Sequence, residues 1–529
     1  MEESPRPSRN IYTPLLVAVT LAGGVFLGKY MAPLSRSHPI NKIDEVLNYI
    51  EREYVDTISE KTLEEDAINA TLQGLDPHSF YIPAEELQGV NEPLEGEFDG
   101  IGVEFHVQED TIMVVTPISG GPSESLGIQP GDRIVKVNGE NVAGIHISNK
   151  EVMQKLRGKN GTRVKVSISR RGHTGLIEYT ITRGKIPLYS VDFSYMIRPG
   201  IGYIKISRFA ENTYGEFMEA MNRLGKQGMQ KLILDLRSNP GGYLNAATRI
   251  ADEFLDDEKE IVYTEGKARP KTVYNASSRG VFEKGSLSVL IDEGSASASE
   301  IVAGALQDWD RALIIGRRSF GKGLVQDQVP LGDGSALRLT IARYYTPSGR
   351  CIQKSYKNGL ENYQNEVLGR MRHGELESAD SISLADTVKH YTRIKHRIVY
   401  AGGGIMPDIF VPVDTSRYSA FYSDVLNSGT VNQFVYDYVD KNRAALSARY
   451  HVFKQYMQNF SVDDVLYKSF LEYAGHAGML KDEHGMKKSS PLIRLQLKAL
   501  IARQLWGNDG FYPVIQQEDN ALRKAIEEN

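Results

Sequence analysis

The apolar positions of this chain follow three spacings in turn, and each spacing predicts a different kind of element. From Ile43 to Tyr54 apolar residues recur every three or four positions, which predicts a helix. From about residue 95 to 184 apolar and polar residues alternate in short runs such as VEFHV and TIMVV, separated by Asn-Gly and Pro-Gly pairs. This alternation predicts short strands joined by turns, with one helix near Asn149–Leu156.

The third spacing runs from about Lys185 to Lys354, where strand-like and helix-like stretches alternate. The predicted strands are IGYIKIS, KLILDLR, SLSVLID and RALIIG, and the predicted helices run through Phe217–Leu224, Leu244–Phe254 and Ser299–Trp309. Strands interleaved with helices indicate an α/β sheet. From about Ser416 onward the apolar stripes have helical spacing again.

These patterns divide the 529 residues into five segments and predict a multidomain protein. The predicted segments are 1–37, an N-terminal flank; 38–94, a helical region; 95–184, a mostly β module; 185–414, an α/β core; and 415–529, a helical C-terminal region. The polar stretch 356–394 is predicted to be an insertion in the core. The candidate chemistry belongs to the core, because its motifs stand at the ends of predicted strands.

An uncharged segment of 18 residues, Ile11 to Gly28, follows Arg6 and Arg9 near the N-terminus. Its length, apolarity and basic flank predict an export signal or a membrane anchor whose basic end stays in the cytoplasm. No convincing small-x-small cleavage site follows the segment. An uncleaved signal anchor is therefore favoured over a cleaved signal, and a buried core helix is the third alternative.

Composition narrows the partners but does not identify the compartment. The formal net charge of −5 is small and the sequence contains no long Lys/Arg run, which argues against nucleic-acid binding. The single cysteine, Cys351, excludes an internal disulfide. Its neighbours, SGRCIQ, are typical of a turn that enters a strand, so a structural cysteine is favoured over a nucleophile.

A serine-rich tract and a lysine on a glycine turn are the main candidates for catalysis. The tract GSASASE, Gly294 to Glu300, stands between a predicted strand and a predicted helix, and Lys322 follows 22 residues later between two glycines. No histidine occurs from Thr174 to Arg372, so a Ser-His-Asp triad within this core is excluded. The remaining bases for a serine nucleophile are a carboxylate or a lysine whose pKa is lowered by burial.

The three serines of the tract are Ser295, Ser297 and Ser299. We expect one of them to cap the helix that follows and another to react. The backbone N–H of the residue after the nucleophile is then a candidate oxyanion donor. The glycines of DLRSNPGG, Asp235 to Gly242, offer further N–H groups before a helix, although a tight turn explains them equally well.

The segment Gly316 to Gly323 nearly matches the phosphate-binding pattern GxxxxGK[ST]. Gly323 replaces the Ser or Thr that would hold magnesium, and LVQDQV alternates like a strand where a phosphate loop needs a helix. Nucleotide binding is therefore disfavoured. In a strand, Lys322 and Gln326 share one face because four is an even step, so Gln326 can orient the amine without charging it.

A second glycine turn belongs to the β module, where Gly100, Ile101, Gly102 and Val103 follow Asp99 and enter a strand. Consecutive N–H groups in such a turn suit a carboxylate, and the strand edge beside it can accept an extended peptide. The turn alone is weak evidence. Together with LGIQPGDRIVKVNG it makes the module resemble a PDZ domain, which holds the C-termini of peptides.

The combined motifs resemble the carboxyl-terminal processing proteases, also called tail-specific proteases, of peptidase family S41 in the bacterial cell envelope. The motifs that carry the resemblance are LDPHSFYIP, the PDZ-like module, DLRSNPGG, GSASASEIVAGALQD, GKGLVQ, YYTPSGRCIQ and GGGIMPD. They cover about residues 40–412. The resemblance implies a crotonase-like or Clp-protease-like α/β core and neither a metal nor a nucleotide cofactor.

The resemblance also implies roles for individual residues. Ser297 would be the nucleophile, Lys322 the general base and Gln326 the residue that orients it. Gly242 and Ala298 would supply the oxyanion N–H groups.

For peptide recognition, the resemblance implies binding at Gly100 to Val103 and a link through Arg157 from the bound peptide to the active site. The implied function is a serine endopeptidase that binds substrate C-termini, anchored in the inner membrane with a periplasmic body. A non-catalytic PDZ scaffold is the alternative. Dimerisation through the C-terminal region is a further prediction.

Overall fold

The computed structural model describes residues 12–31, 42–108, 110–382 and 388–529. It divides into two compact units, Met1–Leu75 and Asp76–Asn529. The first unit contains the helices α1 (Tyr12–Met31), α2 (Lys42–Glu53) and α3 (Glu60–Gln73). The predicted anchor lies largely in α1, and Ile11 lies outside the described residues. Within the described ranges we find no helix that is both long and apolar enough to cross a membrane.

The centre of the second unit is a six-stranded sheet, which confirms the predicted α/β core. Its strands are β10 (Val191–Arg198), β11 (Ile201–Ile206), β12 (Lys231–Asp235), β15 (Ser286–Ile291), β16 (Leu313–Gly316) and β21 (Ile409–Phe410). The order is β10-β11-β12-β15-β16-β21, and all neighbours except β10 and β11 are parallel. Parallel strands are buried on both faces, which explains continuous apolar runs such as Leu232–Leu234 in β12.

Helices cover both faces of this sheet. On one face lie α7 (Thr213–Lys226), α8 (Leu244–Asp252) and α9 (Ala298–Asp308), which share the largest hydrophobic core. On the other face lies α17 (Asn520–Glu528), whose Ala521, Leu522 and Ala525 pack against Tyr203 and Leu290. The predicted helical region 415–529 therefore includes one helix, α17, that packs on the core sheet.

A second, five-stranded sheet carries the segment after the glycine turn. Its strands are β1 (Phe80–Ile82), β13 (Glu260–Gly266), β14 (Arg269–Asn275), β17 (Leu324–Pro330) and β18 (Ala336–Tyr345). The strand β17 confirms the prediction from LVQDQV, but Lys322 precedes the strand. The strand β1 pairs with β18, so the predicted helical region 38–94 also contains a short strand. Three residues are too few to show an alternating pattern.

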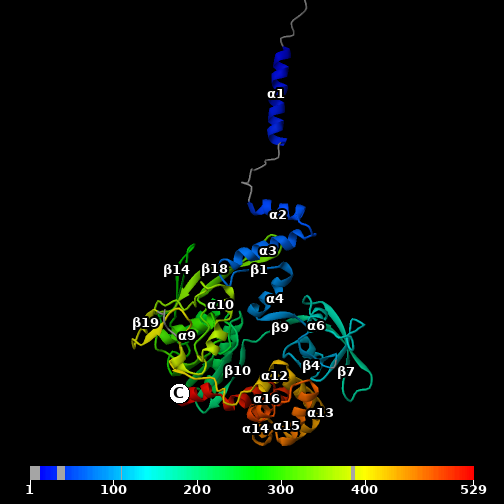
Figure 1. Cartoon of the computed structure of the whole chain (residues 1–529), viewed down its shortest axis with the longest axis vertical. Helices are drawn as coiled ribbons and strands as arrows, with labels where there is room; N and C mark the ends of the chain where they lie inside the picture. Colours follow the sequence, from blue (N-terminus) through cyan, green and yellow to red (C-terminus); the bar gives the residue numbers. More distant parts are fainter. Residues whose placement is uncertain (1–11, 32–41, 109, 383–387) are drawn as a thin grey trace, which may run out of the picture. The chain divides into compact units, whose positions relative to one another are not determined.

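The PDZ-like module forms a sheet of its own, drawn in blue to cyan in Figure 1. Its elements are β3 (Val103–Gln108), β4 (Thr111–Pro117), α5 (Pro122–Ser125), β5 (Arg133–Val137), β6 (Glu140–Asn141), α6 (Asn149–Leu156), β7 (Arg163–Ser169) and β8 (Leu176–Thr182). The chain enters and leaves it through β2 (Glu97–Gly100) and β9 (Gly184–Pro187), which pair antiparallel. The module is therefore inserted between α4 (Ala84–Glu95) and the core.

The C-terminal helices α12 to α16 share a separate hydrophobic core and appear in orange to red in Figure 1. They are α12 (Ala420–Asn427), α13 (Thr430–Arg449), α14 (Phe453–Asn459), α15 (Asp464–His476) and α16 (Glu483–Ile515), the last with a kink at Trp506 and Gly507. These helices also contact β3, since Asp437 accepts a hydrogen bond from Gln108 and Arg503 lies 3.6 Å from Glu104.

The predicted insertion contains the short helices α10 (Leu360–Gln364) and α11 (Glu366–Arg372) and the strand β19 (Lys389–Tyr391), which pairs with β20 (Ile398–Tyr400). Residues 383–387 lie outside the described residues. Helix α11 supports the loop before Lys322, because the buried Arg370 donates to the carbonyl oxygens of Ser319 and Phe320. The insertion is thus part of the structure around the candidate site.

Candidate active site

One cavity of about 1160 Å³ brings together four of the residues predicted for catalysis. Ser297, Lys322, Gln326 and Gly242 all line it. The cavity wall also includes residues of α4, the helix just before the PDZ-like module. The motifs that are separate in sequence therefore meet in one concave site, slightly larger than a typical small-molecule pocket.

Ser297 is the serine of the tract that faces the cavity. It follows β15 and stands at the N-cap position of α9 with φ 54° and ψ −113°, a region that residues other than glycine rarely occupy. Ser295 and Ser299 are fully buried, and their hydroxyls donate to the carbonyl oxygens of Leu236 and Asn239. The structure therefore differs from the expectation that one serine caps α9 and another reacts. Ser297 occupies the N-cap position and also faces the cavity, while Ser295 and Ser299 bond to the loop after β12.

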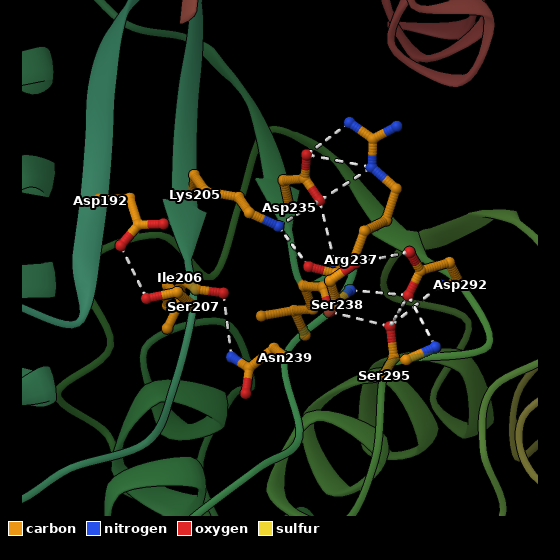
Figure 2. A network of polar contacts seen from close by, with 12 residues as sticks. Asp192, Lys205, Ile206, Ser207, Asp235, Arg237, Ser238, Asn239, Asp292 and Ser295 are labelled. Carbon is orange, nitrogen blue, oxygen red and sulfur yellow. Dashed lines mark hydrogen bonds and ion pairs between the residues drawn. The ribbon is translucent and has the colours of Figure 1, made fainter. Parts of the chain in front are cut away.

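Figure 2 shows how the loops after β12 and β15 are tied to each other. The Asp292 carboxylate accepts from the backbone N–H of Ser238 at 2.7 Å, and the backbone N–H of Asp292 donates to Ser295 Oγ at 2.9 Å. The Asn239 side chain donates to Ile206 O and accepts from Gly241 N, each at 2.9 Å. These bonds fix the DLRSNPGG loop against the serine loop.

The start of the same loop is anchored by charge. The Arg237 guanidinium lies 2.6 Å from Asp235 and 2.7 Å from Asp519, which precedes α17. Lys205 adds a contact to Asp235 at 3.4 Å (Figure 2). Burial alone would raise the pKa of Asp235, but Arg237 and Lys205 outweigh it and hold that pKa below its usual range. The carboxylate is thus ionised at neutral pH.

The glycines of the loop press directly against the serine. A Cβ at Gly241 would lie 2.7 Å from the Cβ of Ser297 and 2.9 Å from Ala298 N, so only glycine fits there. Gly242 is equally confined by the carbonyl of Phe209. Within the described ranges, the backbone N–H groups of Gly242 and Ala298 have no hydrogen-bond acceptor, whereas that of Gly241 bonds to Asn239. The two free donors are those predicted for the oxyanion hole.

Lys322 has the surroundings of a neutral amine. Its Nζ donates to Gln326 Oε1 at 2.9 Å, and among the described residues no carboxylate lies within ion-pair distance of it. Burial, followed by the charge of Arg338, lowers the pKa of Lys322 to about 8. A substantial fraction of the amine is then unprotonated just above neutral pH, which a general base requires.

Gln326 is fixed by a residue from far outside the core. Its Nε2 donates to the carbonyl oxygen of His78, so its Oε1 faces the amine of Lys322. The stretch from Thr174 to Arg372 lacks histidine, but His78 approaches the site from the segment before β1. The imidazole Nε2 bonds to the hydroxyl of Tyr363 at 2.7 Å, and burial, then Lys322, lowers the pKa of His78 to about 4.

The buried carboxylate of Glu300 holds the candidate nucleophile and base together. Its Oε2 accepts from the backbone N–H of Ser297 at 2.8 Å and of Lys322 at 2.9 Å, and its Oε1 accepts from Gly321 N at 2.7 Å. Burial raises the pKa of Glu300 to about 7, although these donors act in the opposite direction. Tyr344 adds a second bridge, since its hydroxyl contacts Ser297 O and donates to Lys322 O at 2.6 Å.

The peptide-binding residues predicted in the PDZ-like module lie where an extended peptide could add to the sheet. Gly100 ends β2, Val103 begins β3, and Gly102 between them has φ 73°. The strand β3 is the first in its sheet, paired only with β4 among the described strands. One edge of β3 therefore has no strand partner among the described residues, as β-strand addition requires.

Arg157 connects this module to the wall of the cavity. It follows α6, and its guanidinium lies 2.5 Å from the Glu92 carboxylate and 4.6 Å from the ring centre of Phe98. Glu92 belongs to α4, whose Asn91, Leu94 and Glu95 line the cavity. The structure thus brings Arg157 into contact with the cavity wall but not with Ser297 or Lys322.

Four contributors to the site were not predicted from the sequence: Asn239, Glu300, His78 and Arg338. A signal existed for one of them, since Ser297 and Glu300 have the S-x-x-E spacing of a capping box. Asn239 and His78 lie within the motifs DLRSNPGG and LDPHSFYIP, but no pattern gave either residue a role, and Arg338 stands at a plain strand position. No group of residues suited to a metal ion occurs in the described part of the chain.

Comparisons with known protein families match three parts of the chain. Residues 200–362 match the model of peptidase family S41, residues 113–170 match that of a PDZ domain, and residues 421–507 match a family of unknown function. The chain is 36% identical over 350 residues to the carboxy-terminal-processing protease of Bartonella bacilliformis, which covers 63% of this chain and 80% of the relative. It is 36% identical over 334 residues to carboxy-terminal processing protease CtpB of Bacillus subtilis, or 62% of this chain and 68% of the relative.

Two solved structures are also similar. A photosystem II D1 C-terminal processing protease is 28% identical and covers 71% of this chain and 93% of its own, with a TM-score of 0.36. The PDZ domain of a carboxy-terminal protease from Vibrio cholerae, solved in complex with a peptide, is 28% identical and covers 17% of this chain and 99% of its own, with a TM-score of 0.16.

Proposed function

The chain belongs to the carboxy-terminal processing proteases of peptidase family S41, and from that premise we propose that it is a serine endopeptidase with Ser297 as nucleophile and Lys322 as general base. One observation carries the proposal. Lys322 has a lowered pKa and no carboxylate partner among the described residues. Its backbone N–H and that of the strained Ser297 both donate to the carboxylate of Glu300. A serine becomes nucleophilic only when such a base takes its proton.

In the proposed mechanism, neutral Lys322 accepts the proton of Ser297 Oγ as this oxygen attacks the carbonyl carbon of the scissile peptide bond. The N–H groups of Gly242 and Ala298 donate to the oxyanion that forms, and each such donor contributes about 3 kcal/mol. Protonated Lys322 then gives its proton to the leaving amine. A water molecule, deprotonated by the same lysine, hydrolyses the acyl-enzyme and regenerates both residues.

Gln326 is proposed to keep Lys322 pointed at the serine without adding charge. Because Gln326 Nε2 is held by the carbonyl of His78, its Oε1 is the atom left to accept from the lysine amine. A carboxylate in the same place would raise the pKa of Lys322 and keep it protonated. An uncharged acceptor therefore suits a lysine that acts as a base.

The PDZ domain is proposed to select substrates by their C-termini, with the carboxylate at Gly100 to Val103 and the peptide along the open edge of β3. The contact of Arg157 with Glu92 is proposed to carry the effect of a bound peptide to α4 and the cavity wall. Substrates would be proteins or peptides whose C-termini are extended and accessible.

The proposal is tested by turnover of an unfolded protein and of a fluorogenic peptide. Ser297→Ala and Lys322→Ala should each abolish cleavage while the thermal unfolding profile stays cooperative, and Lys284→Ala, on an exposed lysine, should cleave like the parent. A fluorophosphonate probe should label Ser297 and neither Ser295 nor Ser299, read by mass spectrometry. Cleavage by either catalytic variant would refute the assignment, and binding without any turnover by the parent would point to a scaffold.

We also propose that the protein acts in the cell envelope, held at the inner membrane by residues 11–28. The uncharged run after Arg6 and Arg9 supports this location. Fractionation of cells and sequencing of the mature N-terminus would test it. Recovery of a chain that lacks residues 11–28, or of the whole chain from the cytosol, would contradict the anchor.

A further inference from the structure

Arg338 is near the start of β18, between β1 and β17, and residues of β17 also line the active cavity. In the strand register it stands opposite Phe80 of β1 on one side and Gln328 of β17 on the other. It lines the same cavity as Ser297 and Lys322. The mechanism proposed above gives Arg338 no contact with the reacting atoms, although its charge contributes to the lowered pKa of Lys322.

The contacts of the Arg338 guanidinium are all with uncharged groups. Its Nη2 donates to Gln328 Oε1 at 2.7 Å and to Asn91 Oδ1 at 3.4 Å, and its Cζ lies 5.3 Å from the ring centre of Phe80. Throughout the described part of the chain, Nε and Nη1 have no acceptor and the guanidinium has no carboxylate within 4.0 Å. Most of its donors are therefore available to a ligand.

The acidic residues that line the cavity do not neutralise Arg338. Asp327 is paired with Arg269 at 3.0 Å. Glu95 and Glu211 also line the cavity, but neither carboxylate lies within 4.0 Å of the Arg338 guanidinium. A half-buried cation that lacks an anionic partner is costly, and burial lowers the pKa of Arg338 accordingly. Binding an anion would remove this cost.

The position of Arg338 relates it to the scissile bond. Its partner Gln328 lies two residues beyond Gln326 on the same face of β17, which is about 7 Å along a strand. That distance equals about two residues of extended peptide. A substrate group bound at Arg338 would therefore belong to a residue close to the bond that Ser297 attacks. The planar guanidinium presents parallel donors that match a carboxylate.

We propose that Arg338 forms a carboxylate-binding subsite in the active cavity, which recognises a carboxylate of the peptide a few residues from the scissile bond. The inference rests on the proposed peptidase function. The carboxylate would come from an acidic side chain or from the C-terminal residue of a short substrate. In either case the subsite adds a second test of the substrate, separate from the one made by the PDZ domain.

Binding to the full-length chain measures this directly, with Ser297→Ala in every protein so that no peptide is consumed. The first pair of labelled peptides has an amidated C-terminus and carries Glu or Gln near the scissile bond. The second pair is neutral and ends in a free carboxylate or an amide. Arg338→Gln removes the charge, Arg338→Lys retains it without the planar donors, and Arg343→Gln is the matched control on the exposed side of the same strand.

We expect the charged member of at least one pair to bind about tenfold more tightly in the Arg338 protein, as a charge-assisted hydrogen bond would provide. In the Glu/Gln pair, Arg338→Gln should reduce the preference for the charged peptide to about onefold. In the pair with a free or amidated C-terminus, it should leave only the part of the preference that the PDZ domain contributes. Arg338→Lys should show an intermediate preference for the charged peptide. Arg343→Gln should show the same preference as the protein that retains both arginines. The pair that responds identifies the source of the carboxylate.

Two results would overturn the proposal: no preference in either pair, or a preference that Arg338→Gln leaves unchanged. A shift of the pH profile of cleavage with no change in either preference would mean that Arg338 acts only on Lys322. Turnover is measured separately with Ser297 intact. A parent that fails to cleave refutes the peptidase function, while the binding result still decides the subsite.

Discussion

Replacing Lys322 with methionine should make the folded protein more stable at neutral pH while abolishing activity. The lowered pKa of about 8 means that the folded state disfavours the charged amine. Between this value and the unfolded value near 10.5, the unfolded chain binds more protons, so the stability of the parent rises with pH across that interval. Below pH 8 the amine is charged in both states, so the full free-energy cost of burying the charge lowers the stability of the folded protein.

The magnitude follows from the shift. At about 1.4 kcal/mol per pKa unit, Lys322 costs roughly 3 kcal/mol at pH 7 and less than about 1 kcal/mol at pH 10. Methionine removes this cost but leaves Gln326 Oε1 without its donor, which costs about 1 kcal/mol. The variant should therefore gain about 2 kcal/mol at pH 7 and almost nothing at pH 10.

Urea unfolding at both pH values measures this difference. The chain has two tryptophans, and Trp506→Phe in every protein leaves Trp309, at the end of α9, as the reporter of the core. Lys284→Met, on an exposed lysine, is the matched control and should differ little from the parent at either pH. A Lys322→Met variant that is less stable than the parent at pH 7, or whose stability runs parallel to the parent with pH, would show that Lys322 is charged in the fold. Such a lysine could not be the base.

Three further predictions concern residues around the dyad. The kcat/KM for a neutral peptide should rise with a midpoint near pH 8 as Lys322 loses its proton, and a midpoint well below pH 8 would contradict Lys322 as the general base. Glu300→Gln should lower kcat by about 10- to 100-fold with little change in KM, because hydrogen bonds from two N–H groups to a carboxylate are lost. Fluorophosphonate labelling of Ser297 should slow in parallel. Unchanged labelling would contradict the role of Glu300 in holding Ser297 and Lys322. Gly241→Ala should abolish activity through contact with Ser297, measured by peptide turnover, whereas Gly172→Ala, with a similar positive φ and open space around it, should retain activity.

The sequence predicted the elements that repeat a long pattern and missed those that depend on distant partners. The central sheet followed from apolar runs such as KLIL, and the motifs placed Ser297, Lys322 and Gln326 in one site. The short strand β1 could not be predicted, because its three residues are fixed by pairing with β18 more than 250 residues later. His78 reaches Gln326 only through that pairing.

Other gaps have a different physical cause. Glu300 looks like the first-turn acid of a helix, and only the fold shows that its carboxylate also receives the N–H of Lys322. Arg338 looks like an ordinary strand residue, since the absence of an anionic partner is a property of the assembled cavity. The apolar stripe of α17 predicts a helix packed on one face, but the pattern alone does not identify the central sheet as its partner.

The paired strands β2 and β9 have a consequence for how specificity can change. The chain leaves the peptidase at Glu97 and returns opposite it at Pro187, with Gly100 and Gly184 as the last facing pair before the PDZ domain. Facing residues in such a ribbon are only about 5 Å apart. A different recognition domain could therefore be grafted between these glycines without separating β1 from β18. Within this family, the choice of substrate and the cleavage of the bond can evolve as separate parts.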